Sequence, residues 1–279
     1  AGAIESPNPG AGACAGWCTD TAYDLPAERI GHSVVAYNGF LYAFGGVNDS
    51  GTRQSTVYIA KIGANGEPSL WHPTDTNKNN WVYWYTATAL STERSYFSAV
   101  AYNNRMYILG GQNNSNTGGV TTVEYASISP NGTLSAWSTT GMSTLPSARF
   151  GQTTHIYNDY IYLIGGNSSG TLQNTVHYTK LKSDGTMNSW ISTTAFPTAR
   201  MTAGGTFSVI YGGYLYITGG CSAVDGSGYC STVQSDTILA SINSDGSLTD
   251  WGSIADLVNI RMGHSLVAWR NAIYGIGGC

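Results

Sequence analysis

A five-fold internal repeat constrains the fold of this 279-residue chain more than any other feature of its sequence. The most regular copy runs from Arg149 to Trp190. Patterning predicts strands at 153–157, 160–164 and 175–181 and a fourth that ends at Trp190, with tight turns at Asn158-Asp159 and Asp184-Gly185. The pair Gly165-Gly166 ends the second strand, which indicates a bend or a close approach between two backbones. Each copy is therefore predicted to be a four-stranded antiparallel unit.

The five copies share residues at matching positions. Each opens with an arginine, has a tyrosine three residues before a glycine pair, and is associated with a tryptophan that closes the unit. The arginines are Arg29, Arg94, Arg149, Arg200 and Arg261, and the tryptophans are Trp17, Trp84, Trp137, Trp190 and Trp251. The first glycine of the pair follows the arginine by 16 positions in the first, second, third and fifth copies, and by 19 positions in the fourth copy. Repeats of roughly 50 residues are typical of β-propeller blades, so the sequence predicts an all-β propeller.

The order arginine, strand, Tyr-x-x-Gly-Gly, loop, strand, turn and tryptophan resembles the kelch repeat, and it extends over essentially the whole chain. This resemblance implies a kelch-like β-propeller that occupies residues 1–279 as a single domain. Kelch propellers include scaffolds, glycan-binding proteins and a few enzymes, so the resemblance defines the architecture more closely than the activity.

The two ends of the sequence are predicted to share the last blade. Residues 3–17 parallel residues 127–137, which belong to the outer half of a blade, and the chain ends after the second strand of the fifth copy. We expect residues 1–17 to supply outer strands and residues 261–279 to supply inner strands. Such pairing closes a five-bladed ring and covers the exposed sheet edges.

Composition excludes some classes of partner. Charged residues make up 10% of the chain and the formal net charge is −4, so no basic surface for nucleic acid is expected. No apolar run reaches the roughly 20 residues that span a bilayer. Cys221 and Cys230 bracket a short glycine-rich loop, which favours a disulfide and an oxidising, extracellular location. The odd count of five cysteines leaves one thiol without a partner in this chain.

The repeat arginines are the first candidate ligand-binding residues. Each directly precedes the innermost strand of a kelch-like blade, so Arg29, Arg94, Arg149, Arg200 and Arg261 are expected near one mouth of the central channel. A ring of guanidinium groups there is suited to carboxylates or sulfates. The alternative is that each arginine bonds to carbonyl groups of its own blade. Glu28 and Glu93 precede two of these arginines and are the carboxylates best placed to join such a site.

A second candidate surface lies in an insertion after the first blade, residues 72–84. It brings His72, Trp81 and Tyr83 together among several asparagines, and exposed aromatic rings beside amide groups suit the binding of a sugar ring. The alternative is that these aromatic side chains pack over the outer edge of the blade. The insertion either splits the fourth strand, with Trp84 as the repeat tryptophan, or lengthens the loop that follows Trp71.

These features predict a secreted or cell-surface binding and adhesion module that recognises a glycan or another surface protein through loops at one face. No catalytic residue, metal site or cofactor is predicted, because metal-ligand spacings such as His-x-His or Cys-x-x-Cys are lacking. Two alternatives stay open. Resemblance to kelch-type sialic acid mutarotases implies an enzyme that uses the arginines with Glu28 or Glu93 and a histidine. A structural spacer within a larger surface protein is the other.

Overall fold

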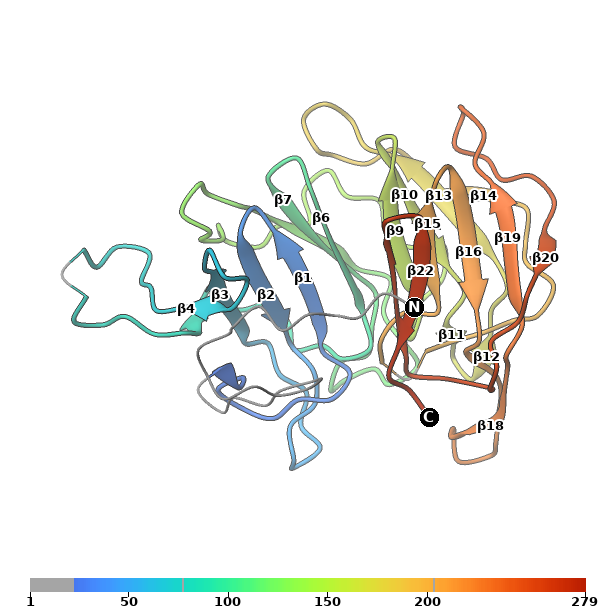
Figure 1. Cartoon of the computed structure of the whole chain (residues 1–279), viewed down its shortest axis with the longest axis horizontal. Helices are drawn as coiled ribbons and strands as arrows, with labels where there is room; N and C mark the ends of the chain where they lie inside the picture. The colour runs from blue at the N-terminus through green and yellow to red at the C-terminus, as the bar shows by residue number, and fades with distance from the viewer. Residues whose placement is uncertain (1–22, 77, 203) are drawn as a thin grey trace.

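The computed structural model describes residues 23–279 except residues 77 and 203. In these residues antiparallel strands form five successive units, which we call blades 1 to 5 (Figure 1). Blade 1 comprises β1 (Ser33–Tyr37), β2 (Phe40–Phe44), β3 (Val57–Ile62), β4 (Pro68–Ser69) and β5 (Tyr85–Thr86). Blade 2 comprises β6 (Ser98–Tyr102), β7 (Arg105–Leu109) and β8 (Val123–Ser127). The all-β kelch-like architecture predicted from the repeats is confirmed.

Blades 3 and 4 have four-stranded sheets. Blade 3 comprises β9 (Thr153–Tyr157), β10 (Tyr160–Ile164), β13 (Val176–Lys180) and β14 (Ile191–Thr193), with the small hairpin β11 (Asn167–Ser168) and β12 (Thr171–Leu172). Blade 4 comprises β15 (Ser208–Tyr211), β16 (Tyr214–Thr218), β19 (Thr237–Ser241) and β20 (Gly252–Ile254), with the hairpin β17 (Cys221–Val224) and β18 (Cys230–Val233). Blade 5 contributes β21 (Ser265–Trp269) and β22 (Ala272–Ile276).

The fourth strand of blade 3 differs from the prediction. It was expected to end at Trp190, but β14 begins one residue later and pairs with β13. The Trp190 indole instead donates a hydrogen bond of 3.4 Å to the Ser143 carbonyl, which belongs to the preceding blade's exit loop. Trp137, Trp251 and Trp84 make the same kind of bond, to the carbonyls of Thr88, Thr194 and Tyr23. The repeat tryptophan therefore joins neighbouring blades.

The same bond identifies Trp84 as the repeat tryptophan of blade 1. Strands β4 and β5, on either side of the insertion, both pair with β3, and Trp71 is buried and bridged to Val82. Of the two interpretations of the insertion, the structure therefore supports the one in which it splits the fourth strand. Figure 1 shows it projecting from the outer edge of blade 1.

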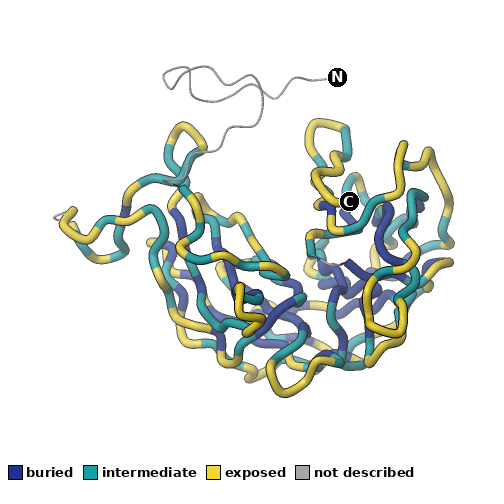
Figure 2. Tube along the Cα trace, turned by 90° about the horizontal axis from the view of Figure 1, so that it is seen from below, coloured by how far each residue is buried: buried dark blue, intermediate teal, exposed yellow. Residues whose placement is uncertain are grey.

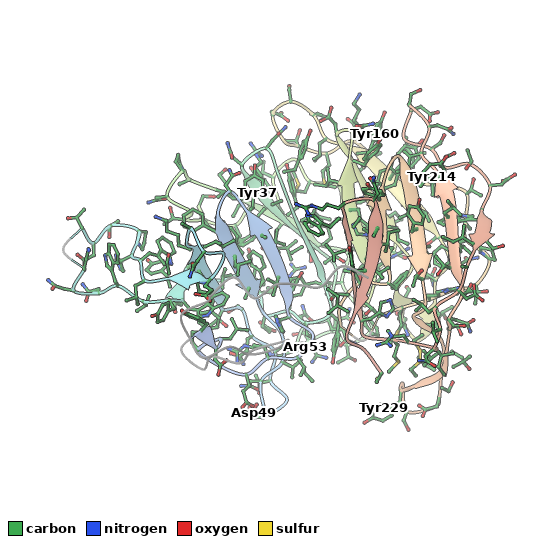
Figure 3. The ribbon with its side chains drawn as sticks, viewed as in Figure 1. Tyr37, Asp49, Arg53, Tyr160, Tyr214 and Tyr229 are labelled. Atoms are coloured by element: carbon green, nitrogen blue, oxygen red, sulfur yellow. A yellow bond between two sulfur atoms is a disulfide. The ribbon has the colours of Figure 1, made fainter. Side chains whose placement is uncertain are left out.

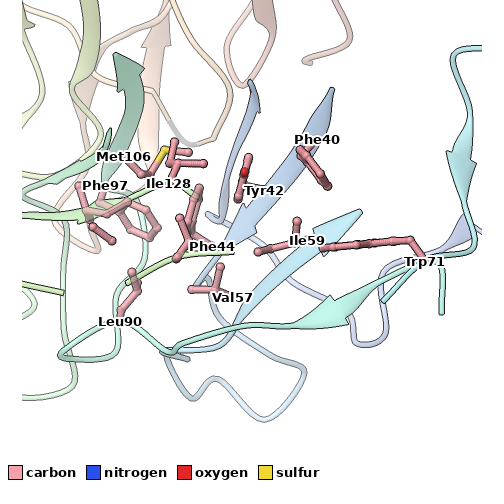
Figure 4. Close-up of a cluster of buried hydrophobic side chains, with 13 residues drawn as sticks. Phe40, Tyr42, Phe44, Val57, Ile59, Trp71, Leu90, Phe97, Met106 and Ile128 are labelled. Atoms are coloured by element: carbon pink, nitrogen blue, oxygen red, sulfur yellow. The ribbon is translucent and has the colours of Figure 1, made fainter. Parts of the chain in front are cut away.

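The hydrophobic core lies between the blades. On β10, Tyr162 and Ile164 pack toward blade 4, whereas Ile161 and Leu163 pack toward blade 2. Side chains of a strand alternate between its two faces, so a strand with a blade on each side is apolar at every position. A third cluster, shown in Figure 4, joins β2 and β3 of blade 1 to Met106 of blade 2.

The five blades follow an arc around a central axis, with the innermost strands β1, β6, β9, β15 and β21 in succession (Figure 2). These strands contact one another in the order β1, β6, β9, β15 and β21, so blade 1 and the β21–β22 hairpin are the first and last blades of the arc. Large apolar side chains are exposed at both ends, including Ile30 and Val34 in blade 1 and Trp269 and Ile276 in blade 5. The predicted sharing of the last blade by residues 1–17 lies outside the described residues.

Candidate functional site

The repeat arginines lie inside the blades. Arg94, Arg149 and Arg200 are at most 2% exposed. Each donates from its Nη1 atom to the carbonyl of the first glycine in its own blade's pair: Gly110 at 3.0 Å, Gly165 at 3.1 Å and Gly219 at 2.8 Å. Side chains this deeply buried cannot contact a ligand at the channel mouth. For these three arginines the expected anion-binding ring is therefore wrong, and the alternative of bonds within the blade is what the structure contains.

Buried charges accompany two of these arginines. Arg94 forms an ion pair of 3.2 Å with the fully buried Glu124, and Arg200 pairs with Asp236. Among the described residues Arg149 has no acidic partner, and burial lowers its pKa to about 10. The outer members of the series are half-buried. Arg261 donates to the Gly277 carbonyl, whereas Arg29 donates to Glu28 and Thr56.

The glycine pairs complete this connection between blades. The second glycine donates its N–H to the carbonyl of the next blade's arginine, as Gly166 does to Arg200 at 2.7 Å. Gly165 and Gly166 have φ angles of 59° and 98°, and a Cβ on Gly165 would lie 2.6 Å from the Arg200 carbonyl oxygen. Only glycine satisfies both conditions without strain. The predicted close backbone approach is thus the contact that joins one blade to the next.

The two candidate carboxylates, Glu28 and Glu93, each interact with a loop residue. Glu28 is exposed, and a hydrogen bond and like charge from Asp49 raise its pKa. Glu93 accepts a hydrogen bond of 3.2 Å from the Asn114 backbone, so it holds the loop between β7 and β8. Both carboxylates have structural partners in loops.

The aromatic residues of the insertion contact Asp75 of their own hairpin and Tyr23. The Trp81 indole donates to the Asp75 carbonyl at 2.7 Å, and His72 Nδ1 accepts from the Asp75 N–H at 3.0 Å. Tyr83 packs edge-on against Tyr23, with ring centroids 5.0 Å apart. These three predicted site residues thus lie on the outer edge of blade 1, apart from the arginines.

The loops that follow the glycine pairs gather at one face of the molecule, which we call the loop face. Figure 3 shows Asp49, Arg53 and Tyr229 at this face and Tyr37, Tyr160 and Tyr214 at the opposite one, where the tight hairpin turns lie. The loops are joined by side-chain and backbone hydrogen bonds. Arg53 donates to Gln112 at 2.9 Å, and the Ser169 N–H donates to the Gly118 carbonyl at 3.1 Å. The loop face is therefore cross-connected from blade 1 to blade 3.

A cleft of about 680 Å³ opens among the loops of blades 2, 3 and 4. Its polar lining includes the amides Gln112 and Asn167 and several hydroxyl groups, and its apolar lining includes Phe150, Met201 and Met262. Asp225 is the single acid among the described lining residues, and none of them is Lys or Arg. A volume of this size with a few placed polar groups is typical of ligand sites. The nearly uncharged lining suits an uncharged ligand.

The β17–β18 hairpin forms one wall of this cleft. Cys221 and Cys230 form the predicted disulfide, which ties the two strands of the hairpin. The Asp225 carboxylate accepts hydrogen bonds from the N–H groups of Ser227 at 2.8 Å and Tyr229 at 3.0 Å, so it shapes the turn. Tyr229, beside this turn, is 74% exposed. An exposed tyrosine is thus held at the rim of the cleft.

Beneath the cleft, the central channel contains a cavity of about 300 Å³. Hydroxyl and amide side chains from the start of the innermost strands line it, among them Ser98, Gln152, Thr153 and Thr154. The Gln152 amide donates to the Leu109 carbonyl at 2.8 Å, while its Oε1 atom and the Thr154 hydroxyl have no hydrogen-bond partner in the described part of the chain. His32 is the ionisable lining residue besides Tyr96, and burial lowers its pKa. The channel is therefore polar and uncharged at neutral pH.

Tyr96 lies between the two spaces and lines both. It stands two residues after a repeat arginine, where three other copies have Gly31, Gly151 and Gly263. These glycines have φ angles of 61° to 68°, and Tyr96 has φ of 54°. Tyr96 was not predicted as a site residue, although the sequence shows that it replaces the glycine of the Arg-x-Gly pattern. It is the described aromatic residue at the junction of cleft and channel.

Comparison with known proteins supports the fold. A family model described as the KLHDC2/KLHL20/DRC7 Kelch-repeats domain matches residues 66–278. Kelch-like protein 36 of Rattus norvegicus and that of Mus musculus are each 23% identical to this chain over 265 residues. Those alignments cover 94% of this chain and 37% of each relative, so the chain spans little more than a third of the curated relatives' length.

A solved structure titled "Structure of YjhT" matches with a TM-score of 0.65 at 17% sequence identity. The match covers 90% of this chain and 77% of that chain, and it concerns the fold. The family model covers well over half of the sequence, and its range includes four of the five arginine and glycine-pair copies. This chain belongs to the kelch-repeat family.

Proposed function

We propose that the protein is an extracellular binding module that recognises a glycan at its loop face. The observation that carries this proposal is the cleft of about 680 Å³, with amide, hydroxyl and aromatic groups and a single acid in its described lining. Sugars present hydroxyl groups on their rim and apolar C–H groups on their ring faces. Amides bond the former, and aromatic rings pack on the latter.

The disulfide supports the extracellular location, because such bonds persist in oxidising compartments. The surface is solvated mainly by uncharged side chains, since only 10% of the residues are charged. In the described part of the chain no helix has the length and apolar character needed to cross a membrane. The enzymatic alternative gains no support from Arg94, Arg149 and Arg200, which are bonded inside the blades.

A protein ligand is the second candidate, and it has its own support. Kelch-repeat domains mediate protein–protein interaction. The rim of the cleft presents Tyr229, and its lining includes Phe150, Met201 and Met262. Exposed aromatic residues and methionine are enriched in protein interfaces. Either ligand would use the same face.

A glycan array tests the proposal, with wild type compared with Tyr229→Ala and Tyr214→Ala. Both tyrosines are exposed, but Tyr214 lies at the opposite face (Figure 3), so its variant is a matched control. We expect Tyr229→Ala to weaken glycan binding by about tenfold and Tyr214→Ala to leave it unchanged. Absence of any glycan hit for wild type contradicts the glycan proposal and leaves the protein ligand as the candidate.

A further inference from the structure

We propose that Tyr96 is the specificity-determining residue of the loop face, and that it admits one neutral sugar unit from the cleft into the channel beneath. This inference rests on the proposed glycan-binding function and names its ligand more closely. It identifies the channel cavity as the subsite for an uncharged, hydroxyl-rich group.

The backbone of Tyr96 is held in a conformation that its side chain opposes. A bulky residue with positive φ is an outlier, and such outliers concentrate at functional sites. Tyr96 donates its N–H to the Gly31 carbonyl at 2.7 Å, and its own carbonyl accepts from Gly151 at 2.8 Å. Thr202 continues this series with a bond of 2.8 Å to Gly151. The bonds pass from blade to blade around the channel mouth, and they fix the φ angle at position 96.

A glycine at position 96 would keep these bonds without strain, and glycine adopts a similar φ angle at this position in three other blades. The chain instead carries a tyrosine there, and its ring lies directly over Gly31. A Cβ on Gly31 would come within 2.7 Å of that ring. The scaffold thus accepts a conformational cost to place an aromatic ring at the boundary between cleft and channel.

Two residues that line the channel beyond this ring carry buried oxygen atoms without a hydrogen-bond partner. Gln152 is 2% exposed and Thr154 6% exposed, yet Gln152 Oε1 and Thr154 Oγ1 lack partners in the part of the chain that the structure describes. Buried polar atoms are normally hydrogen-bonded, so these two indicate a missing partner. The Gln152 amide nitrogen is held by Leu109, which leaves Oε1 free to accept.

Size and charge select the ligand class. A cavity of about 300 Å³ is at the lower end of the range for small-molecule sites, which suits one sugar ring. Its described lining carries no carboxylate, lysine or arginine, and burial lowers the pKa of His32. A carboxylated sugar would lose its hydration there with no cation in exchange. A neutral hexose or N-acetylhexosamine fits both conditions.

Saturation-transfer NMR with free monosaccharides tests the inference. The probes are glucose, galactose, mannose and N-acetylglucosamine, with glucuronic acid and N-acetylneuraminic acid as charged counterparts. The proteins are wild type, Tyr96→Gly, Tyr96→Phe, Thr154→Val and the opposite-face control Tyr214→Ala. We expect transfer to at least one neutral sugar and to neither acid for wild type and the control, and loss of transfer for Tyr96→Gly and Thr154→Val.

Thermal melting separates a binding role from a structural one. Tyr96→Gly relieves the positive φ, and Thr154→Val removes an unpartnered hydroxyl, so both variants should melt at or above the wild-type temperature. Tyr96→Phe keeps the ring and should retain binding. If Tyr96→Gly fails to fold, Thr154→Val carries the test alone.

The outcomes distinguish this inference from the proposed function. If wild type binds glycans on the array but Tyr96→Gly and Thr154→Val bind sugars as wild type does, the channel subsite is refuted and the loop-face function stands. Transfer to the charged sugars would also refute the neutral subsite. If wild type binds no glycan and no free sugar, both proposals fail.

Discussion

Arginine at the start of each repeat illustrates how burial decides a residue's role. The sequence places five arginines before the innermost strands, and both a ligand-binding and a structural role are compatible with that position. The structure separates them through exposure, since Arg149 is 1% exposed and donates to Gly165, Thr175 and Ser147. Spacing predicted the position, but it could not predict on which side of the loop the guanidinium lies.

Replacing Arg149 by lysine tests this assignment. Lysine keeps the charge but cannot reach three acceptors with a planar group. We expect Arg149→Lys to lower the free energy of unfolding by about 2–4 kcal/mol, measured by urea denaturation, with unchanged glycan affinity of the folded protein. Arg270→Lys is the control, because Arg270 is exposed and contacts the Trp269 ring. Wild-type stability with weakened binding would restore the ligand-binding role.

Two histidines give the stability a pH dependence. Burial lowers the pKa of His155 to about 4, and burial together with the charge of Arg149 lowers that of His177 to about 4. The unfolded chain therefore takes up protons near pH 6.5, whereas the folded chain does so only near pH 4. This contribution to stability is full above pH 6.5 and is lost as the pH falls toward 4.

Urea midpoints measured from pH 7 to pH 4 check this expectation. The free energy of unfolding should fall through that window by up to about 3 kcal/mol for each histidine, because each tenfold difference in proton affinity between the folded and unfolded chain corresponds to about 1.4 kcal/mol. The double variant His155→Asn, His177→Asn should show a flatter profile. A wild-type profile that is flat between pH 6.5 and pH 4 would contradict the buried, neutral state of both rings.

The role of Tyr96 could not be predicted from local sequence patterns. Its departure from Arg-x-Gly is visible in the sequence, but its meaning depends on the ring lying over Gly31 and lining two spaces. Those contacts join residues 65 positions apart, and no local pattern encodes them. The sequence could therefore predict loops at one face as the candidate site, but it could not predict the place of Tyr96 between the cleft and the channel.

At the scale of elements, strand patterning and turn chemistry carried most of the prediction. Asn158 and Asp159 both adopt positive φ, at 48° and 66°, as expected for a two-residue hairpin turn. The apolar run of β10 follows from a blade on each side. The start of β14 was missed because Trp190 was counted as a strand residue, whereas its indole bonds to the neighbouring blade.

The disulfide of the β17–β18 hairpin is expected to support both stability and glycan binding. Removing its disulfide with the double variant Cys221→Ala, Cys230→Ala should lower the free energy of unfolding by about 2–3 kcal/mol. It should also weaken glycan binding, because Tyr229 would no longer be held at the rim of the cleft. Thermal melts and array titrations measure both, and added reductant should affect wild type but not the variant. Full affinity of the reduced wild type would show that the hairpin is not part of the site.

At the scale of the whole molecule, tyrosine hydroxyls connect the blades in order. Tyr42, Tyr107 and Tyr162 each donate to the carbonyl of a turn glycine in the next blade: Gly132, Gly185 and Gly246, at 3.0, 3.0 and 2.9 Å. Tyr216 is the next tyrosine in this series. The apolar side chains Ile254, Val258 and Ile260, which follow the third strand of blade 4, are exposed in the described chain. The outer half of blade 5 is the surface that residues 3–17 were predicted to supply.

We propose, as the repeats predict, that residues 1–17 complete the last blade and thereby provide the acceptor for the Tyr216 hydroxyl. Tyr216→Phe should then cost about 1 kcal/mol in the full chain, as Tyr162→Phe should, and nothing in a chain without residues 1–17. Urea denaturation of the four combinations gives this coupling. An equal cost of Tyr216→Phe with and without residues 1–17 would contradict the proposed sharing of the last blade.

The repeat positions were predictable because every copy carries its own arginine, tyrosine and glycine pair, but the four-stranded prediction fails for blade 2, whose sheet has three strands. The cleft at the loop face was not predictable, because it is formed by the parts that differ among copies: the loop of blade 2, the β11–β12 hairpin and the disulfide hairpin of blade 4. These three segments are unequal, and only the folded chain brings them together. Figure 2 shows how the arc brings distant segments of the chain around one axis.

NMR of the methionine methyl groups tests most directly whether a glycan binds at the loop face. Of the five methionines, Met201 and Met262 line the cleft, whereas Met106 and Met187 are buried between blades and Met142 packs against the blade 2–blade 3 cluster. Titration with a glycan found on the array should shift the methyl signals of Met201 and Met262 and leave the other three in place. Saturable binding that leaves Met201 and Met262 unshifted would contradict a ligand site at the loop face.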